Sequence, residues 1–267
     1  TDTRTLYPGD LFVALRGEQF DAHEFLEDVR EAGAVGAVVE AGHPMLTSPA
    51  LEGWPLIVCD DTRHALGTLG QAWRQRYELS VVAITGSNGK TTTKELVAHL
   101  CRAVAGDDAV LSTLGNFNNE IGLPLTLLRL GPQHRYAVIE IGMSHPGEIA
   151  ALAQLANSDG TPWLTGKKVT SFTNAEELLL MPDAAKRFPF LLQSKLAQQG
   201  ALFAEGPRYL PNLVIDGQLI TGQNPWSVWQ LAEATVRALG VEPLPRLASA
   251  EERTMQLLQT HQSQGLA

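Results

Sequence analysis

One stretch of the sequence, VVAITGSNGKTTT beginning at Val81, constrains the fold more than any other. Its first four residues, ending at Ile84, are apolar and largely β-branched, which predicts a strand covered on both faces of a sheet. Gly86 and Gly89 then permit backbone angles and a close approach that side chains would block. Apolar residues recur at helical spacing after this turn, which predicts a helix beginning at Lys90. They are Leu96, Val97, Leu100, Cys101 and Val104.

A glycine-rich turn between a strand and a helix is typical of a phosphate-binding loop. Backbone N–H groups at the helix start attract phosphate, and the helix dipole adds to the attraction. Lys90 would reach the terminal phosphates, and the Thr91 hydroxyl would bind Mg²⁺. The form is the compact Gly-x-x-Gly-Lys-Thr, because Thr85 stands where the full pattern has a glycine. The alternative is a glycine turn that happens to precede a lysine. The predicted nucleotide-binding residues are Gly86, Ser87, Asn88, Gly89, Lys90, Thr91 and Thr92.

Composition narrows the class of partner. At 267 residues the chain exceeds one average domain. A formal net charge of −9 and the lack of a basic stripe argue against a nucleic-acid partner, so a free nucleotide is expected at the loop. No apolar run is long enough to span a bilayer, and no charged and apolar leader opens the chain, so a cytoplasmic protein is expected. Cys59 and Cys101 are expected to be reduced core thiols.

The predicted elements suggest an α/β protein of several domains. Strands are expected at residues 10–15, 34–40 and 55–59, with helices at 21–32 and 62–76, which together make a small α/β domain. His23 in this part is interpreted as a surface or capping histidine rather than a catalyst. The predicted divisions are a first domain at 1–77, a nucleotide-binding domain at 78–156, a third segment at 157–241 and a tail at 242–267.

Several motifs in the first part, taken in order, resemble the Mur ligase family. They are TDTR at 1–4, GDLFVALRG at 9–17, GSNGKTT at 86–92, GNFNNEIGLP at 115–124 and EIGMSH at 140–145. The resemblance covers residues 1–156 and implies a P-loop domain with a mostly parallel sheet and helices on both faces. The sequence FDAH at 20–23 is similar to the branch that adds D-alanyl-D-alanine to UDP-N-acetylmuramoyl-tripeptide.

The resemblance also implies substrate contacts. It assigns Asp2, Thr3 and Arg4 to the domain that holds the uridine nucleotide of the UDP-linked muramoyl peptide. From the residues alone, an N-terminal loop capped by hydroxyls is the preferred interpretation. A second set would recognise sugar and peptide beside the phosphate, since amides donate and accept hydrogen bonds without charge. The set is Asn116, Asn118 and Asn119, and the resemblance adds His145 to the substrate-binding residues. The alternatives are an asparagine-capped turn and, for His145, the start of a helix.

Glu140 ends the predicted strand at residues 136–140, where a parallel sheet presents its ligands. The resemblance makes Glu140 a Mg²⁺ ligand together with Thr91, and two protein oxygens suffice for this ion. A solvated glutamate at a strand end is the alternative. In the family reaction ATP converts a substrate carboxylate to an acyl phosphate, and an amine then displaces phosphate. Lys90 and Glu140 are therefore the predicted catalytic residues, acting by positioning and electrostatics.

After residue 156 the Mur ligase motifs give way to a different pattern. Residues 157–239 resemble the C-terminal half of the class I glutamine-amidotransferase-like superfamily, of flavodoxin-like fold, in its PfpI-type branch. That family uses a cysteine at a strand-to-helix turn followed by histidine, and neither Cys59 nor Cys101 is expected at such a turn. Glu176 and Glu177 are interpreted as a solvated loop. Two families therefore appear joined near residue 156.

Further elements are expected in this second part. Asp216-Gly217 between two short apolar runs predicts a β-hairpin. Apolar helices at residues 188–199 and 226–239 could cover the open sheet of the first part. The tail from residue 242 is expected to be a frayed helix or a loose end.

Three functions remain open on sequence grounds. The first is an ATP-dependent Mur-type ligase in which ATP and Mg²⁺ binding is expected more firmly than full turnover. The second is an amidotransferase-like or chaperone-like protein that lacks its catalytic cysteine. The third is a nucleotide binder with no further activity. No oligomeric state is predicted.

Overall fold

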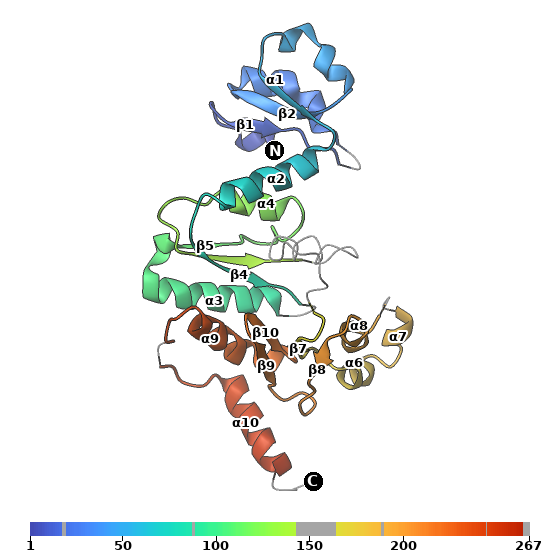
Figure 1. Cartoon of the computed structure of the whole chain (residues 1–267), viewed down its shortest axis with the longest axis vertical. Helices are drawn as coiled ribbons and strands as arrows, with labels where there is room; N and C mark the ends of the chain where they lie inside the picture. Colours follow the sequence, from blue (N-terminus) through green and yellow to red (C-terminus); the bar gives the residue numbers. More distant parts are fainter. Residues whose placement is uncertain (18–19, 87–88, 143–163, 188–189, 244, 264–267) are drawn as a thin grey trace. The chain divides into compact units, whose positions relative to one another are not determined.

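The structure is a computed structural model in which two compact units are distinguished (Figure 1). The first unit comprises Thr1–Tyr77 and Glu120–Leu130, and the second comprises Glu78–Asn119 and Gly131–Ala267. The residues described are 1–17, 20–86, 89–142, 164–187, 190–243 and 245–263. Among these, no helix combines the length and the apolar character needed to cross a lipid bilayer.

The first unit is built on a small parallel sheet with strand order β1-β2-β3. Its strands are β1 (Leu11–Val13), β2 (Gly36–Glu40) and β3 (Leu56–Cys59). Its α-helices are α1 (Leu26–Glu31), α2 (Thr62–Arg74) and α4 (Gly122–Leu127). Short 3-10 turns occur at η1 (Thr3–Thr5), η2 (Ala22–Phe25), η3 (Pro44–Thr47) and η4 (Pro49–Leu51). The predicted α/β class is confirmed, and each predicted strand is present in shortened form.

Side chains alternate between the two faces of this sheet, as the period of a strand requires. Phe12 and Val39 join the cluster that includes Leu26 of α1. Val13 and Val38 join the opposite cluster with Leu66 of α2. Residues of α4 and its flanks pack against this second cluster, which explains why Glu120–Leu130 belongs to the first unit.

The second unit contains the predicted strand–loop–helix. Its parallel sheet has the order β4-β6-β5, with β4 at Ser80–Ile84, β5 at Val110–Ser112 and β6 at Tyr136–Glu140. Helix α3 (Lys90–Ala105) follows the glycine loop, and η5 (Asp107–Ala109) precedes β5. The prediction that β4 is covered on both faces is wrong, because Val81 and Ala83 share one face of the strand and are exposed, Val81 by 40%. The central strand β6 is buried along its whole length, and so is β5.

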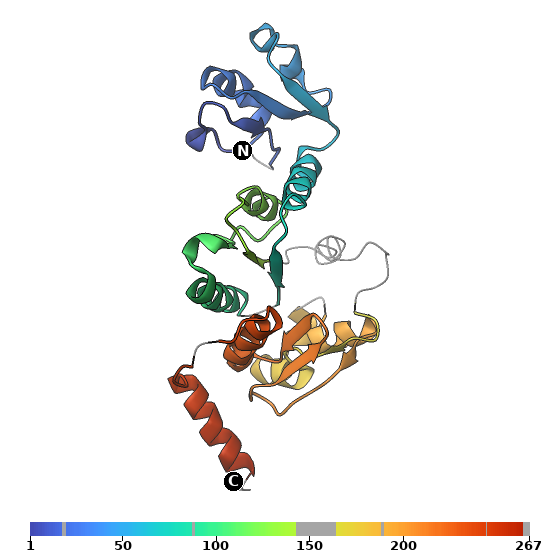
Figure 2. The ribbon, with the colours of Figure 1, turned by 60° about the vertical axis from the view of Figure 1, so that its left-hand side comes forward.

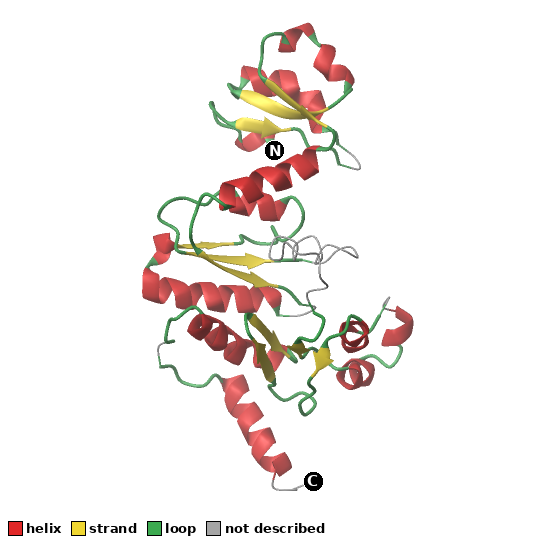
Figure 3. Cartoon of the chain, viewed as in Figure 1, coloured by secondary structure: helices red, strands yellow, loops and turns green. Residues whose placement is uncertain are grey.

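The C-terminal segment adds two small sheets and several helices, coloured by type in Figure 3. Strands β7 (Lys168–Val169) and β8 (Leu202–Phe203) are parallel. Strands β9 (Leu213–Asp216) and β10 (Leu219–Gly222) form the predicted antiparallel hairpin, with Gly217 at φ 60° in its turn. The helices are α6 (Asn174–Leu180), α7 (Ala184–Arg187), α8 (Leu192–Gln198), η6 (Pro225–Ser227), α9 (Val228–Ala238) and α10 (Ala250–Ser263).

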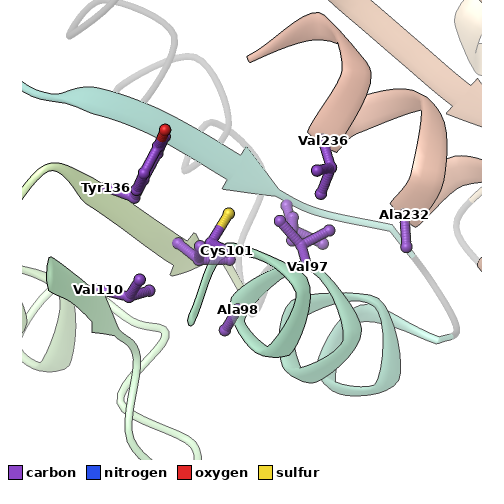
Figure 4. Close-up of a cluster of buried hydrophobic side chains, with 9 residues drawn as sticks. Val97, Ala98, Cys101, Val110, Tyr136, Ala232 and Val236 are labelled. Atoms are coloured by element: carbon purple, nitrogen blue, oxygen red, sulfur yellow. The ribbon is translucent and has the colours of Figure 1, made fainter. Parts of the chain in front are cut away.

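Helices α3 and α9 share one hydrophobic core, although they lie far apart in the sequence. Ala232 and Val236 of α9 join a buried cluster with Val97, Ala98 and Cys101 of α3 (Figure 4). The two helices lie side by side in both ribbon views (Figures 1 and 2). The prediction that C-terminal helices pack on the first part is confirmed for α9, because the same cluster also contains Ile84 of β4 and Val138 of β6. Helix α9 covers the helix that follows the loop, and the described part of α8 has no buried residue.

Candidate functional site

The candidate site lies at the carboxyl ends of the strands in the second unit. Ile84 at the end of β4 is in register with Glu140 at the end of β6, and the N–H of Ile141 donates to the Ile84 carbonyl at 2.8 Å. The glycine loop leaves the sheet directly beyond Ile84. The loop and the carboxylate therefore start at neighbouring strand ends. The carboxyl ends of the strands are the usual ligand position in a parallel sheet.

The loop has the backbone that its glycines allow. Gly89 has φ 73°, a left-handed conformation that disfavours any side chain. It is also the N-cap of α3 and offers no side chain to the helix N–H groups. The first N–H groups of a helix lack partners within the helix, so these are available to an anion. Ser87 and Asn88 lie outside the described residues.

Lys90 bends back over the loop. Its Nζ donates to the Gly86 carbonyl at 2.7 Å, and its side chain is half-buried. Thr91 and Thr92 follow on the first turn of α3 and are exposed. The amine and the free N–H groups together make an electropositive helix start, suited to a phosphate group.

Glu140 is not the solvated glutamate of the alternative interpretation, since it is 2% exposed. Its Oε1 accepts a hydrogen bond from Asn118 Nδ2 at 2.8 Å, and its N–H donates to Thr113 Oγ1 at 2.9 Å. Its Oε2 is buried and has no hydrogen-bond partner among the described residues. A buried carboxylate oxygen without a partner is costly, which indicates that a ligand satisfies it.

A magnesium ion fits these groups. Mg²⁺ prefers oxygen ligands and commonly takes only one or two from protein. Glu140 Oε2 is such an oxygen, and the Thr91 hydroxyl on the first turn of α3 would be the second. The buried orphan oxygen is the structural reason for the fit.

Asn118 is the best-fixed member of the predicted amide cluster. Its N–H donates to the Asn116 carbonyl, and its own carbonyl accepts from the N–H of Gly142, both at 2.7 Å. A Cβ on Gly142 would lie 2.8 Å from Asn118 Oδ1, so glycine is required there. Asn116 and Asn119 are exposed. Their substrate roles stay predictions, and His145 lies outside the described residues.

Asp2, Thr3 and Arg4 lie in the first unit, so no one unit holds the whole predicted site. Asp2 caps η1 and accepts from Arg4 Nε at 2.9 Å and Arg4 Nη2 at 2.8 Å. These hydrogen bonds from Arg4 lower the pKa of Asp2 to about 2. The pair is exposed, as the capped-loop interpretation requires, and its role in substrate binding stays a prediction.

His23 is buried rather than at the surface, and it lies within ligand distance of Asp21 and His43. Its Nδ1 is 2.6 Å from Asp21 Oδ1, and its Nε2 accepts the N–H of Glu40 at 2.9 Å. Because Nε2 acts as the acceptor, the ring proton is on Nδ1 and points at Asp21. A metal ion on Nδ1 would require a doubly deprotonated ring. The three residues are therefore a structural cluster and not a metal site.

The described residues offer no activated cysteine. Cys101 is buried in the α3 core, and burial raises the pKa of its thiol. Cys59 does end a strand shortly before α2, contrary to expectation. Burial raises the pKa of Cys59, and nearby carboxylates, Glu40 foremost, raise it further. A thiol with a raised pKa is a poor nucleophile.

Glu176 is fully buried, so the prediction of a solvated loop is wrong for this residue. Its carboxylate accepts hydrogen bonds from Thr173 N, Tyr209 N, Gln223 Nε2 and Asn224 Nδ2, at distances between 2.6 and 3.1 Å. Burial alone would raise its pKa, but these donors lower the pKa of Glu176 below the usual 4.5. A carboxylate saturated with donors is a structural group and not a general base.

Residues 84–160 match the family model described as the Mur ligase middle domain. The first part of the chain is similar to Mur ligases. A UDP-N-acetylmuramoyl-tripeptide–D-alanyl-D-alanine ligase from Haemophilus influenzae is 48% identical over 150 residues, covering 56% of this chain and 32% of that protein. The enzyme of the same description from Escherichia coli is 45% identical over 159 residues, covering 60% and 33%. The chain thus spans about one third of the length of these curated relatives.

Solved structures show the same fold over more of the chain. The D-alanyl-D-alanyl ligase for UDP-N-acetylmuramoylalanyl-D-glutamyl-2,6-diaminopimelate from Acinetobacter baumannii has a TM-score of 0.60 at 28% identity, and covers 91% of this chain and 60% of that chain. The MurF ligase from Thermotoga maritima, in complex with ADP, has a TM-score of 0.59 at 21% identity, covering 91% and 63%. The resemblance of residues 157–239 to another family stays a prediction.

Proposed function

We propose that this chain carries the ATP-binding machinery of a Mur-type ligase and binds ATP with Mg²⁺ at the glycine loop. The observation that carries the proposal is Glu140 Oε2, a buried oxygen without a partner among the described residues. It lies at the end of β6, in register with the end of the strand that leads into the loop. Sequence similarity to Mur ligases supports the assignment.

Each part of the site has a role in this proposal. The N–H groups at the first turn of α3, which have no partner within the helix, hold the phosphates. The Lys90 amine stabilises negative charge on the terminal phosphoryl group. Thr91 and Glu140 supply oxygens to the cation. The ion, when bound, supplies positive charge that neutralises the phosphate oxygens during transfer.

The proposed substrates are those of the similar ligases from Haemophilus influenzae and Escherichia coli. A carboxylate oxygen of UDP-N-acetylmuramoyl-tripeptide attacks the γ-phosphorus of ATP, which forms an acyl phosphate and releases ADP. The amine of D-alanyl-D-alanine then attacks the acyl carbon, loses a proton and displaces phosphate, which leaves an amide. A cytoplasmic location belongs to the same proposal. The residues proposed to contact these substrates are Asp2, Thr3, Arg4, Asn116, Asn118, Asn119 and His145.

Titration calorimetry with ADP, with and without Mg²⁺, tests the binding proposal. Lys90→Ala removes a charged donor worth about 1.5–3 kcal/mol, so ADP binding should weaken roughly tenfold or more. Lys186→Ala, on the exposed end of α7, is the matched control and should leave the affinity unchanged. Equal affinities for Lys90→Ala and the unaltered protein would contradict the proposal.

Turnover requires a separate assay. Phosphate release is measured with ATP, Mg²⁺, UDP-N-acetylmuramoyl-tripeptide and D-alanyl-D-alanine, each omitted in turn. Release that needs both organic substrates supports ligation by this chain. Nucleotide binding without such release would limit the function to binding.

A further inference from the structure

Lys94 is a charged residue in the interior of the second unit. It lies one turn after Lys90 on α3 and is only 1% exposed. Its Nζ donates to the Thr113 carbonyl at 2.9 Å and lies 2.7 Å from Glu95 Oε1. Burying an ammonium group costs several kcal/mol before its partners compensate, whereas an apolar side chain would fill this place without that cost. The position therefore calls for an explanation other than packing.

Thr113 connects this lysine to the candidate site. It directly follows β5 and is itself 1% exposed. While its carbonyl accepts from Lys94, its hydroxyl accepts the N–H of Glu140 at 2.9 Å. Its own N–H donates to the Val138 carbonyl of β6 at 3.1 Å. One residue thus ties the helix that carries the loop to the strand end that carries the carboxylate.

The position of Glu140 is consequently held from two sides. Asn118 fixes one carboxylate oxygen, and Thr113 fixes the backbone from which the side chain projects. Groups that orient a metal ligand without touching the metal typically change metal affinity 10- to 100-fold when they are mutated. The same magnitude is expected where the oriented ligand is Glu140.

We propose that Lys94 is a positioning residue that acts through Thr113 and Glu140. It sets the separation between the phosphate loop and the carboxylate, and thereby the affinity for the divalent cation in the metal–nucleotide complex. This inference rests on the function proposed above. It adds two residues, Lys94 and Thr113, that act on the cation rather than on the nucleotide itself.

The test measures ADP binding to the full chain while Mg²⁺ is varied. In Lys94→Met and Thr113→Val, the Mg²⁺ concentration that gives half of the maximal enhancement should rise about tenfold or more. The ADP affinity measured in EDTA should stay within about twofold, because the loop is unchanged. Thr113→Ser keeps the hydroxyl and Lys186→Met changes an exposed lysine, so both should behave like the unaltered protein.

A second readout needs neither metal nor nucleotide. Hydrogen exchange at the Glu140 amide should accelerate in Thr113→Val, which lacks the acceptor, and should stay slow in Thr113→Ser. Circular dichroism establishes that each variant folds. If Lys94→Met does not fold, the paired Thr113 variants decide the question.

The outcomes separate the two proposals. A folded Lys94→Met or Thr113→Val protein with the original Mg²⁺ requirement overturns the inference and leaves the proposed function standing. An unaltered protein that binds ADP equally well with and without Mg²⁺ overturns the proposed cation site, and the inference falls with it.

Discussion

Two buried glutamates in the second unit show how one residue type serves different purposes. Glu140 has one oxygen bound by Asn118 and one without a partner among the described residues. Glu176 accepts four hydrogen bonds, one from the N-cap residue of its own helix and three that join α6 to two later loops. The first arrangement is suited to a ligand, whereas the second is suited to holding the fold together. The number of donors distinguishes the two, and exposure does not.

Glu176 should make the second unit sensitive to acid. Its folded pKa lies below the unfolded value near 4.5, so its stabilising contribution is complete above that pH. As the pH falls through the folded pKa, the carboxylate protonates and the contribution is lost. Glu176→Gln should lower the free energy of unfolding at pH 7 by about 2–3 kcal/mol, because an amide nitrogen would face donors.

Urea denaturation between about pH 3 and about pH 7 measures both effects. The variant should also lose part of the acid dependence. Glu177→Gln is the adjacent control and should cost less than about 1 kcal/mol. If the free energy of unfolding varied with pH in the same way in Glu176→Gln and in the unaltered protein, Glu176 would not be the source of the acid sensitivity.

At the scale of elements, the sequence predicted the strands and the hairpin, because these depend on residues close together in the chain. The β-branched apolar runs predicted β2, β4 and β6, and Asp216-Gly217 predicted the hairpin. The order β4-β6-β5 was beyond reach, because neighbouring strands are separated by long stretches of sequence. For the same reason the exposed face of β4 was missed.

The site was predictable to a similar extent. The glycine loop, Lys90 and Glu140 stand in recognisable motifs. The bond from Lys94 to a backbone carbonyl beyond β5 has no sequence signature, although a lysine within the buried stripe of α3 was a visible hint. Glu176 could have been found, since Thr173 and Glu176 have capping-box spacing and form that box.

Gly89 should be irreplaceable for two reasons. Its φ of 73° strains any other residue, and a Cβ would lie 3.3 Å from Val228 Cγ2 of α9. Gly89→Ala should therefore cost about 1 kcal/mol or more in stability and also weaken ADP binding. Gly106, at the other end of α3, has φ 90°, and a Cβ added there would meet nothing within 4 Å. Gly106→Ala should share the stability cost, and only Gly89→Ala should change the ADP affinity in calorimetry.

The contact between α3 and α9 should contribute measurable stability. Val236 is fully buried in the shared cluster, so Val236→Ala should lower the free energy of unfolding by about 2 kcal/mol. Val104 is an exposed valine on α3, and Val104→Ala should change stability by less than about 0.5 kcal/mol. Equal effects in thermal denaturation would show that α9 does not complete this core.

At the scale of the whole molecule, the two units do not follow contiguous segments. Residues 120–130 lie between two stretches of the second unit in sequence, yet belong to the first. The close approach of Gly70 to Pro124, where a Cβ would meet the proline at 2.9 Å, shows how tightly α4 packs on α2. A prediction from sequence divides a chain into contiguous segments, so it could not have assigned residues 120–130 to the first unit. The proposed divisions at 156 and 241 stay predictions.

Ligand binding should stabilise the two units unequally. At a concentration about 100 times its Kd, Mg·ADP should raise the free energy of unfolding of the unit that binds it by about 2.7 kcal/mol. Hydrogen exchange followed by mass spectrometry should therefore slow in peptides of α3, β6 and α9, with little change in peptides of β1 and β2. Equal slowing in both sets of peptides would contradict binding at the glycine loop.

The shared core of α3 and α9 has a consequence for how the chain acquires its structure. During synthesis α3 emerges long before α9, so its apolar side has no permanent cover until the later helix leaves the ribosome. Closing so long a loop is slow, and exposed apolar surface promotes aggregation in the meantime. Refolding yield should therefore fall with protein concentration. Amides of α3 would be among the last in the second unit to become fully protected from hydrogen exchange.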